Sequence, residues 1–172
     1  MFGRSRLVTQ LSEYKSGNNF CVLFLFNTMI RAVQTISAYS TIQADAYTSN
    51  NGTQTQSTSD TGGGSNVGWI HEGNWLGYSL VDFGAPAATQ FVVRVASGAE
   101  NGIDGDINVI LDSPTSATPI CSLHISNTGG WQSWKTISGN VSSVTGTHSV
   151  YLVFTSNQDS DFVNVNWFTF SN

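Results

Sequence analysis

Short runs of alternating apolar and polar residues, separated by turn residues, dominate this sequence. In the run 91–96, for example, Phe91, Val93 and Val95 alternate with residues of the opposite face. Successive side chains of a β-strand point to opposite faces, so this alternation indicates strands with one buried face. No stretch keeps a helical period over about three turns. Roughly nine short strands at this spacing predict an all-β, antiparallel β-sandwich, most simply a jelly roll.

The expected strands are separated by glycine, proline and other turn residues. In chain order they cover 41–47, 67–70, 74–81, 91–96, 107–111, 120–125, 135–137, 150–154 and 162–170. Between the first two, residues 49–66 read as one long polar loop that ends in Gly62-Gly63-Gly64. Connections of this length without periodicity are commonly functional or disordered.

The length of 172 residues favours one domain, and its charge is unevenly divided. Residues 1–37 carry a net charge of +3, whereas the remainder carries −8. So acidic a body is expected to be repelled by nucleic acid and by anionic membranes. A neutral partner or a cation fits this charge better.

Residues 1–37 are predicted to lie outside the fold, which leaves 38–172 as the folded module. The apolar segment 20–26 follows a basic stretch, as in a secretory signal, but Asn27 and Arg31 interrupt it. It is also shorter than the roughly 20 residues that a membrane span needs. A degenerate signal peptide or a linker is the first interpretation, and a gene-boundary artefact is the second. Together with the Gly-, Ser-, Thr- and Asn-rich composition, this predicts a secreted, extracellular protein.

A glycine-hinged loop carries two tryptophans three residues apart, Trp131 and Trp134, after Gly129-Gly130. Odd spacing at the start of a strand sends the two rings to opposite faces, so one can be core while the other is exposed. An exposed indole is a flat apolar plate with one N–H donor, which suits a sugar ring or a partner surface.

Four segments, taken together and in order, resemble the family 6 carbohydrate-binding modules. They are the opening strand 43–47, the glycine-rich stretch 60–75 with its Trp69, the Gly-Gly-Trp-x-x-Trp loop 128–134 and the closing strand 162–168. The resemblance runs from about Thr41 to Phe170. It implies a calcium-stabilised β-sandwich that binds polysaccharide without cleaving it, so no catalytic residue is expected.

By motif position, the resemblance assigns the sugar-binding roles to four residues. Trp69 and Trp131 would clamp a sugar between their rings, and Asn164 would complete the site. Gln56 stands where relatives often carry a Glu, and an amide can still donate and accept. The resemblance further implies that Gln43, Asp45 and Asn166 hold a structural Ca²⁺. Asp45 replaces the usual Glu and Asn166 the usual Asp, and both changes should weaken the site because Ca²⁺ prefers several anionic oxygens.

Other chemistry-bearing residues receive structural interpretations. Trp75, Trp134 and Trp167 lie within apolar strand patterns and are expected in the core. His71 and Glu72 are expected on a solvated loop, and Cys121 is expected as a buried thiol.

Two other classes of function remain open. A glycosidase needs two carboxylates, and the close pairs here are Asp104 with Asp106 and Asp159 with Asp161. Each pair lies in a turn-rich stretch, where Asp commonly bonds its own backbone. In a protein-binding or adhesive sandwich, Trp69 and Trp131 would instead anchor a partner chain. A flat apolar patch favours that alternative, whereas a narrow slot between two rings favours sugar.

The sequence therefore predicts a monomeric, non-catalytic module that targets an attached glycoside hydrolase to cell-wall polysaccharide. Xylan is the first expected ligand and β-glucan the second.

Overall fold

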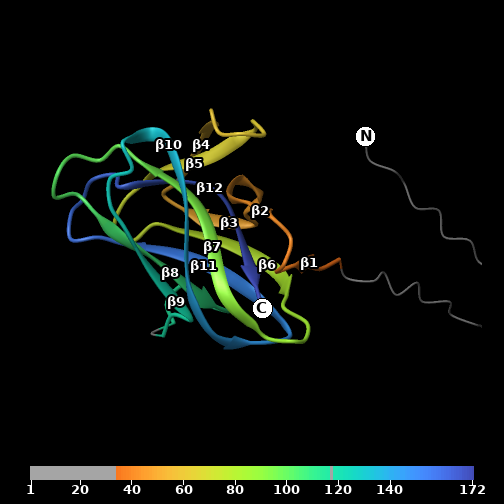
Figure 1. Ribbon diagram of the computed structural model, residues 1–172. Helices are drawn as coiled ribbons and strands as arrows, with labels where there is room; N and C mark the ends of the chain where they lie inside the picture. The colour runs from red at the N-terminus through yellow and green to blue at the C-terminus, as the bar shows by residue number, and fades with distance from the viewer. Residues whose placement is uncertain (1–33, 117) are drawn as a thin grey trace, which may run out of the picture. The chain divides into compact units, whose positions relative to one another are not determined.

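The computed structural model describes residues 34–116 and 118–172, which form two sheets packed face to face (Figure 1). In the first sheet the strand order is β1-β6-β11-β8-β9, with β3 also paired to β6; in the second it is β10-β7-β12-β5-β4, with β2 also paired to β12. The first sheet consists of β1 (Ile36–Ser37), β3 (Ser49–Asn51), β6 (Trp75–Asp82), β8 (Gly105–Leu111), β9 (Cys121–Ile125) and β11 (Thr147–Thr155). The second consists of β2 (Ile42–Gln43), β4 (Gln54–Ser57), β5 (Ser65–Ile70), β7 (Ala88–Ser97), β10 (Gly130–Val144) and β12 (Val163–Ser171).

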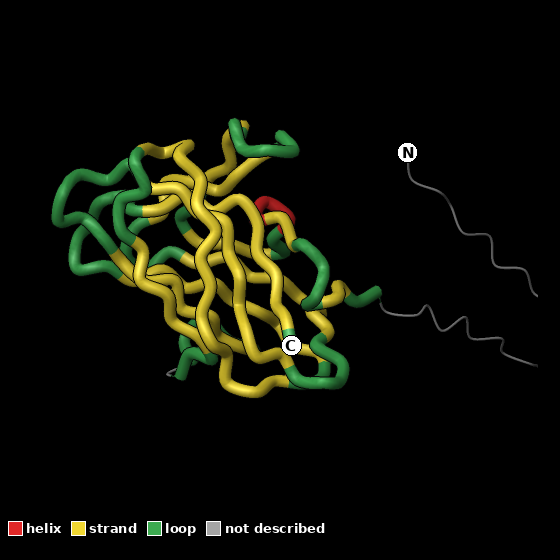
Figure 2. The backbone as a smooth tube through the Cα atoms, in the orientation of Figure 1, coloured by secondary structure: helices red, strands yellow, loops and turns green. Residues whose placement is uncertain are grey.

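The predicted antiparallel β-sandwich is confirmed. Among the described strands, β1 runs parallel to β6, and the other pairs are antiparallel. One 3-10 turn, η1 (Ala44–Ala46), is the only helical element in this part of the chain (red in Figure 2). No helix among the residues described here is long and apolar enough to cross a membrane.

Aromatic rings fill much of the space between the sheets. Phe83 and Phe170 meet edge to face with centroids 4.8 Å apart, as do Tyr78 and Phe168. All four rings are buried, and burying one such side chain contributes about 1.5–3 kcal/mol. Cys121 is also buried, as expected, and desolvation raises the pKa of its thiol. This core gives the loops at the sheet ends a rigid base.

Two predicted elements differ from the structure. The strand expected over 41–47 stops after Gln43 and continues as η1, although Ala44 still faces the core. The long loop expected over 49–66 contains β3, β4 and the start of β5. β3 is fully exposed and β4 nearly so. Such edge strands have no buried face, and so they lack the alternation by which a strand is recognised.

The module also begins earlier than residue 38. Ile36 and Ser37 pair with Val81 and Asp82 of β6, so the sandwich includes them. Of the expected leader 1–37, residues 1–33 lie outside the described part of the chain.

Three tryptophans expected in the core are only half-buried. Each of these residues lies on a strand, is of intermediate burial and stands outside the hydrophobic core: Trp75, Trp134 and Trp167. Their alternation was read correctly as strand, but their rings lie on the outer side of the sheets. Trp75, for instance, packs edge to face on Tyr151 with centroids 5.6 Å apart.

Candidate functional site

A slot of about 270 Å³ opens at the surface between two exposed tryptophans. Gln56, Trp69, Trp131, Asp161 and Asn164 line it. Trp69 is 42% exposed and Trp131 38%, although large apolar side chains are usually covered. The structure thus brings together all four residues predicted to bind sugar, and it adds Asp161.

A bulge in β5 presents Trp69. Opposite β12, the pairing steps from Val163↔Ile70 to Val165↔Val67, so β5 holds one extra residue there. Trp69 itself has a left-handed φ of 54°. A bulge re-aims a side chain, and a left-handed non-glycine residue costs roughly 1–2 kcal/mol. Strain at an exposed ring points to function rather than to stability.

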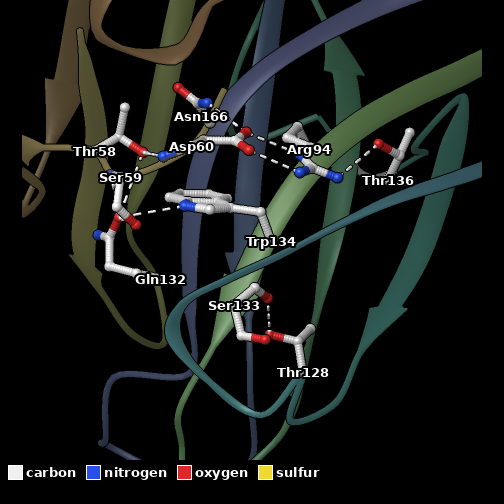
Figure 3. Close-up of polar contacts among 10 residues, drawn as sticks. All are labelled: Thr58, Ser59, Asp60, Arg94, Thr128, Gln132, Ser133, Trp134, Thr136 and Asn166. Carbon is white, nitrogen blue, oxygen red and sulfur yellow. Dashed lines mark hydrogen bonds and ion pairs between the residues drawn. The ribbon is translucent and has the colours of Figure 1, made fainter. Parts of the chain in front are cut away.

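A tightly bonded loop presents Trp131. Gly129 turns the chain with φ 107°, and the Gly129 N–H donates to Asn127 Oδ1 at 2.7 Å. The Thr128 hydroxyl donates to Ser133 O at 2.7 Å and accepts from Ser97 N at 2.8 Å (Figure 3 shows the first). The loop that carries the ring is therefore held in place before any ligand arrives.

Two glycines outside the recognised tryptophan loop make room for the slot. A Cβ on Gly98 would lie 2.7 Å from Trp131 N, and one on Gly68 would lie 2.6 Å from Asn164 Oδ1. The sequence alone did not single out either residue, because close approach between distant segments leaves no local signal.

The floor of the slot is an oriented amide. Asn164 is buried, and its Nδ2 donates to Trp131 O at 2.7 Å. Since that partner is an acceptor, the amide nitrogen must face it. Asn164 Oδ1 then lies beside Gly68. Gln56 Nε2 lies there too, 3.3 Å from the point that a Cβ added to Gly68 would occupy. One acceptor and one donor thus meet at the floor.

Asp161 forms one wall and was missed as a binding residue. It lies in the β11–β12 connection, with Oδ1 3.4 Å from His71 Nδ1. The next residue, Phe162, is buried, and its N–H donates to Ile70 O at 2.9 Å. The sequence alone places Asp161 only in a turn or in a possible catalytic pair, because its contact with His71 joins segments far apart in the chain.

A second cavity, of about 530 Å³, gathers the three predicted calcium ligands. Gln43, Asp45 and Asn166 line it together with the segment 61–65, Thr41 and Trp167. Asn166 is 2% exposed, and its Oδ1 is buried without a hydrogen-bond partner. An orphaned buried acceptor is costly unless something satisfies it. The oxygen donors fit a hard cation, although Asp45 is the only carboxylate among them.

No described group of three or more His, Cys, Asp or Glu side chains could hold a metal. Gln43 and Asn166 would bind a cation through amide oxygens, which are not among those four residue types. This absence therefore does not count against the second cavity.

Asp60 orients Asn166 and was also missed. Asn166 Nδ2 donates to Asp60 Oδ2 at 2.9 Å, which turns the amide oxygen away from the carboxylate. Arg94 binds the same carboxylate through two N–H groups, at 2.9 and 2.7 Å (Figure 3). These hydrogen bonds, that from Arg94 above all, lower the pKa of Asp60 to about 2 despite its burial.

Gln132 ties the loop of Asp60 to the tryptophan loop. Its Oε1 accepts from Ser59 N at 2.8 Å and from Trp134 Nε1 at 3.2 Å (Figure 3). Its Nε2 donates to the buried Asn66 at 3.2 Å. The two cavities therefore share one hydrogen-bonded framework.

Neither carboxylate pair of the enzyme alternative lines the slot as a pair. Asp104 and Asp106 flank His124, at 3.6 and 3.0 Å, in a separate cavity. Asp159 is exposed and does not line the slot, so the lining holds one carboxylate where a glycosidase uses two.

The comparisons with known proteins agree with this geometry. The model of "Carbohydrate binding module (family 6)" matches residues 43–172. Endo-1,4-beta-xylanase A of Thermoclostridium stercorarium is 38% identical over 134 residues, which cover 78% of this chain and 24% of the xylanase. The chain thus spans about a quarter of that relative's length.

Two solved structures of similar length carry the same fold. A beta-1,3-glucan binding family 6 module from Bacillus halodurans has a TM-score of 0.75 at 43% identity, over 81% of this chain and 100% of that one. A family 6 module from Clostridium cellulolyticum, solved in complex with xylose, has a TM-score of 0.72 at 41% identity, over 80% and 100%. The chain is therefore a member of the family 6 carbohydrate-binding modules, a family of non-catalytic binding domains.

Proposed function

We propose that this module binds a neutral cell-wall polysaccharide in the slot between Trp69 and Trp131, and that it holds an attached glycoside hydrolase on that polymer. Xylan is the first candidate ligand and β-glucan the second. The observation that carries the proposal is the pair of exposed indoles facing one slot with an oriented amide at its floor.

The chemistry of a pyranose matches this slot. Its faces present C–H groups, which pack on indole rings, and its rim presents hydroxyls, which donate and accept hydrogen bonds. Asn164 and Gln56 supply an acceptor and a donor at the floor. Affinity at one such site should be modest, because sugar hydroxyls leave water at nearly the cost that their new bonds return.

Relatives support the ligand class and the targeting role. The similar proteins include the xylanase, the xylose complex and the beta-1,3-glucan binding module described above. Because the chain spans only part of the xylanase, a catalytic partner domain in the same protein is part of the proposal. Polysaccharide of this kind lies outside the cell, so the proposal includes secretion.

We further propose that Gln43, Asp45 and Asn166 hold a structural Ca²⁺. A bound cation would satisfy the orphaned Asn166 Oδ1 and would tie β2 to β12 across the second cavity. With one carboxylate in the set, its affinity should be weaker than that of a site with several.

Affinity electrophoresis of the full chain tests the proposed function. Native gels would contain xylan, laminarin, barley β-glucan, agarose or no polymer. Retardation in the xylan or β-glucan gel supports the proposal and names the polymer. Equal mobility in all gels overturns it and favours a protein-binding sandwich.

A further inference from the structure

Asp161 is the one charged side chain among the five that line the slot. Its side chain is 39% exposed, so its carboxylate is available to a ligand. Its backbone is anchored, because the N–H of the adjoining Phe162 bonds Ile70 of β5. A carboxylate at this position faces any sugar that enters the slot.

Two polar groups of the slot, Asp161 and Asn164, accept hydrogen bonds from donors on a ligand, whereas Gln56 supplies a donor. The carboxylate only accepts hydrogen bonds, and the orientation of Asn164 leaves its Oδ1 as a second acceptor at the floor. Sugar hydroxyls donate to such groups. A sugar carboxylate cannot, and it would bring a second negative charge beside the first.

Little positive charge offsets this wall. Arg94 and Lys135 are the only Lys or Arg residues after residue 37. Arg94 is committed to Asp60, and neither lines the slot. The ring of His71 faces Asp161 and compensates only when protonated. Residues 38–172 carry a net charge of −8.

We propose that Asp161 determines specificity in this slot: its carboxylate accepts hydrogen bonds from the hydroxyls of a neutral sugar and weakens the binding of uronic acids and other anionic sugars. This inference rests on the proposed sugar-binding function of the same slot. It predicts that an uronide binds more weakly than its neutral methyl ester, which has nearly the same size.

Titration calorimetry of the full chain tests this with three proteins: wild type, Asp161→Asn and Asp159→Asn. Asp159→Asn is the matched control, because it removes the same charge from an exposed residue of the same connection. The probes are xylotetraose, laminaritetraose, a β-linked oligoglucuronide and the methyl ester of that oligoglucuronide. Thermal melts check that each variant folds.

Wild type should bind the ester about threefold to fivefold more tightly than the acid, as expected for a partly exposed charge pair. Asp161→Asn should close that gap, and Asp159→Asn should keep it. Equal affinity of wild type for acid and ester overturns the inference, as does a gap that survives Asp161→Asn. A slot that rejects the ester as strongly as the acid excludes by size, which also overturns it. If wild type binds neither neutral tetrasaccharide, the proposed function fails and the inference fails with it.

Discussion

At the residue scale, Trp69 combines exposure with backbone strain, and the two can be separated by substitution. Trp69→Ala removes the ring but keeps a left-handed non-glycine residue, whereas Trp69→Gly removes the ring and the strain together. Both variants should lose sugar binding in affinity gels. In urea unfolding, Trp69→Gly should be about 1 kcal/mol more stable than Trp69→Ala. Equal stabilities would mean that this φ stores no strain.

Trp131 and Trp134 should separate binding from stability. Trp131→Ala is expected to abolish retardation in the gels with little change in thermal midpoint, because its ring is exposed. Trp134→Ala should lower the midpoint more, because that ring is half-buried and its Nε1 bonds Gln132. A large loss of stability in Trp131→Ala would make this ring structural and would contradict its place in the slot.

Asp60 should make stability depend on acid pH. Its folded pKa is about 2, below the ordinary value of 3.8. The contribution is therefore fully present above about pH 4 and is lost as the pH falls through about 2, and it amounts to about 2 kcal/mol. Asp60→Asn should be less stable at pH 7 and should lose this part of the acid dependence. Urea unfolding across that pH window measures both, with the exposed Asp159→Asn as control; parallel pH profiles for Asp60→Asn and wild type would contradict the role.

At the element scale, the sequence predicted strands that have one buried face and missed those that have none. β7, β8 and β12 contain buried apolar residues at alternate positions, such as Val93, Ile107 and Phe168, and this pattern predicted them. β3 and β4 lie at sheet edges and are polar on both sides, so they read as loop.

The slot was predictable as far as its motifs extend. Trp69, Trp131, Asn164 and Gln56 follow from the resemblance, whereas Asp161, Gly68 and Gly98 depend on contacts between distant strands. The amphipathic pattern likewise could not tell whether Trp75 or Trp134 faces inward, since a half-buried ring alternates as regularly as a core one.

The floor of the slot depends on the close approach of β5 and β12 at Gly68. Gly68 has no left-handed φ, so its backbone accepts Ala, but the added Cβ would lie 2.6 Å from Asn164 Oδ1. Gly68→Ala should therefore displace the amide and weaken sugar binding tenfold or so, about 1.4 kcal/mol. Gly139→Ala is the matched control. Its added Cβ would also lie 2.6 Å from a side-chain atom, Leu123 Cδ2, but at a position outside the slot. Calorimetry that finds both variants binding like wild type would show that the amide is not part of the site.

At the scale of the whole molecule, hydrogen bonds link the residues around the second cavity to the loop that carries Trp131. Asp60 orients Asn166 on one side, and the neighbouring Ser59 bonds Gln132 beside Trp131 on the other. A cation held by Gln43, Asp45 and Asn166 would therefore stabilise the same loop that supports the tryptophans. Loss of that cation should lower the stability of the fold before it affects sugar binding, because the ligands join β2 and η1 to β12.

Calorimetric melts in calcium and in EDTA test this connection. A ligand that binds only the folded state stabilises it by about 2.7 kcal/mol at a hundredfold excess over its Kd, so EDTA should lower the melting temperature of wild type. Asp45→Asn removes the only carboxylate of the set and should respond to EDTA much less, whereas Asp159→Asn should respond like wild type. Melting curves that coincide in calcium and in EDTA would contradict the proposed Ca²⁺ site. The orphaned Asn166 Oδ1 would then have to be satisfied by water in the cavity, and the framework around Asp60 would serve stability without a metal.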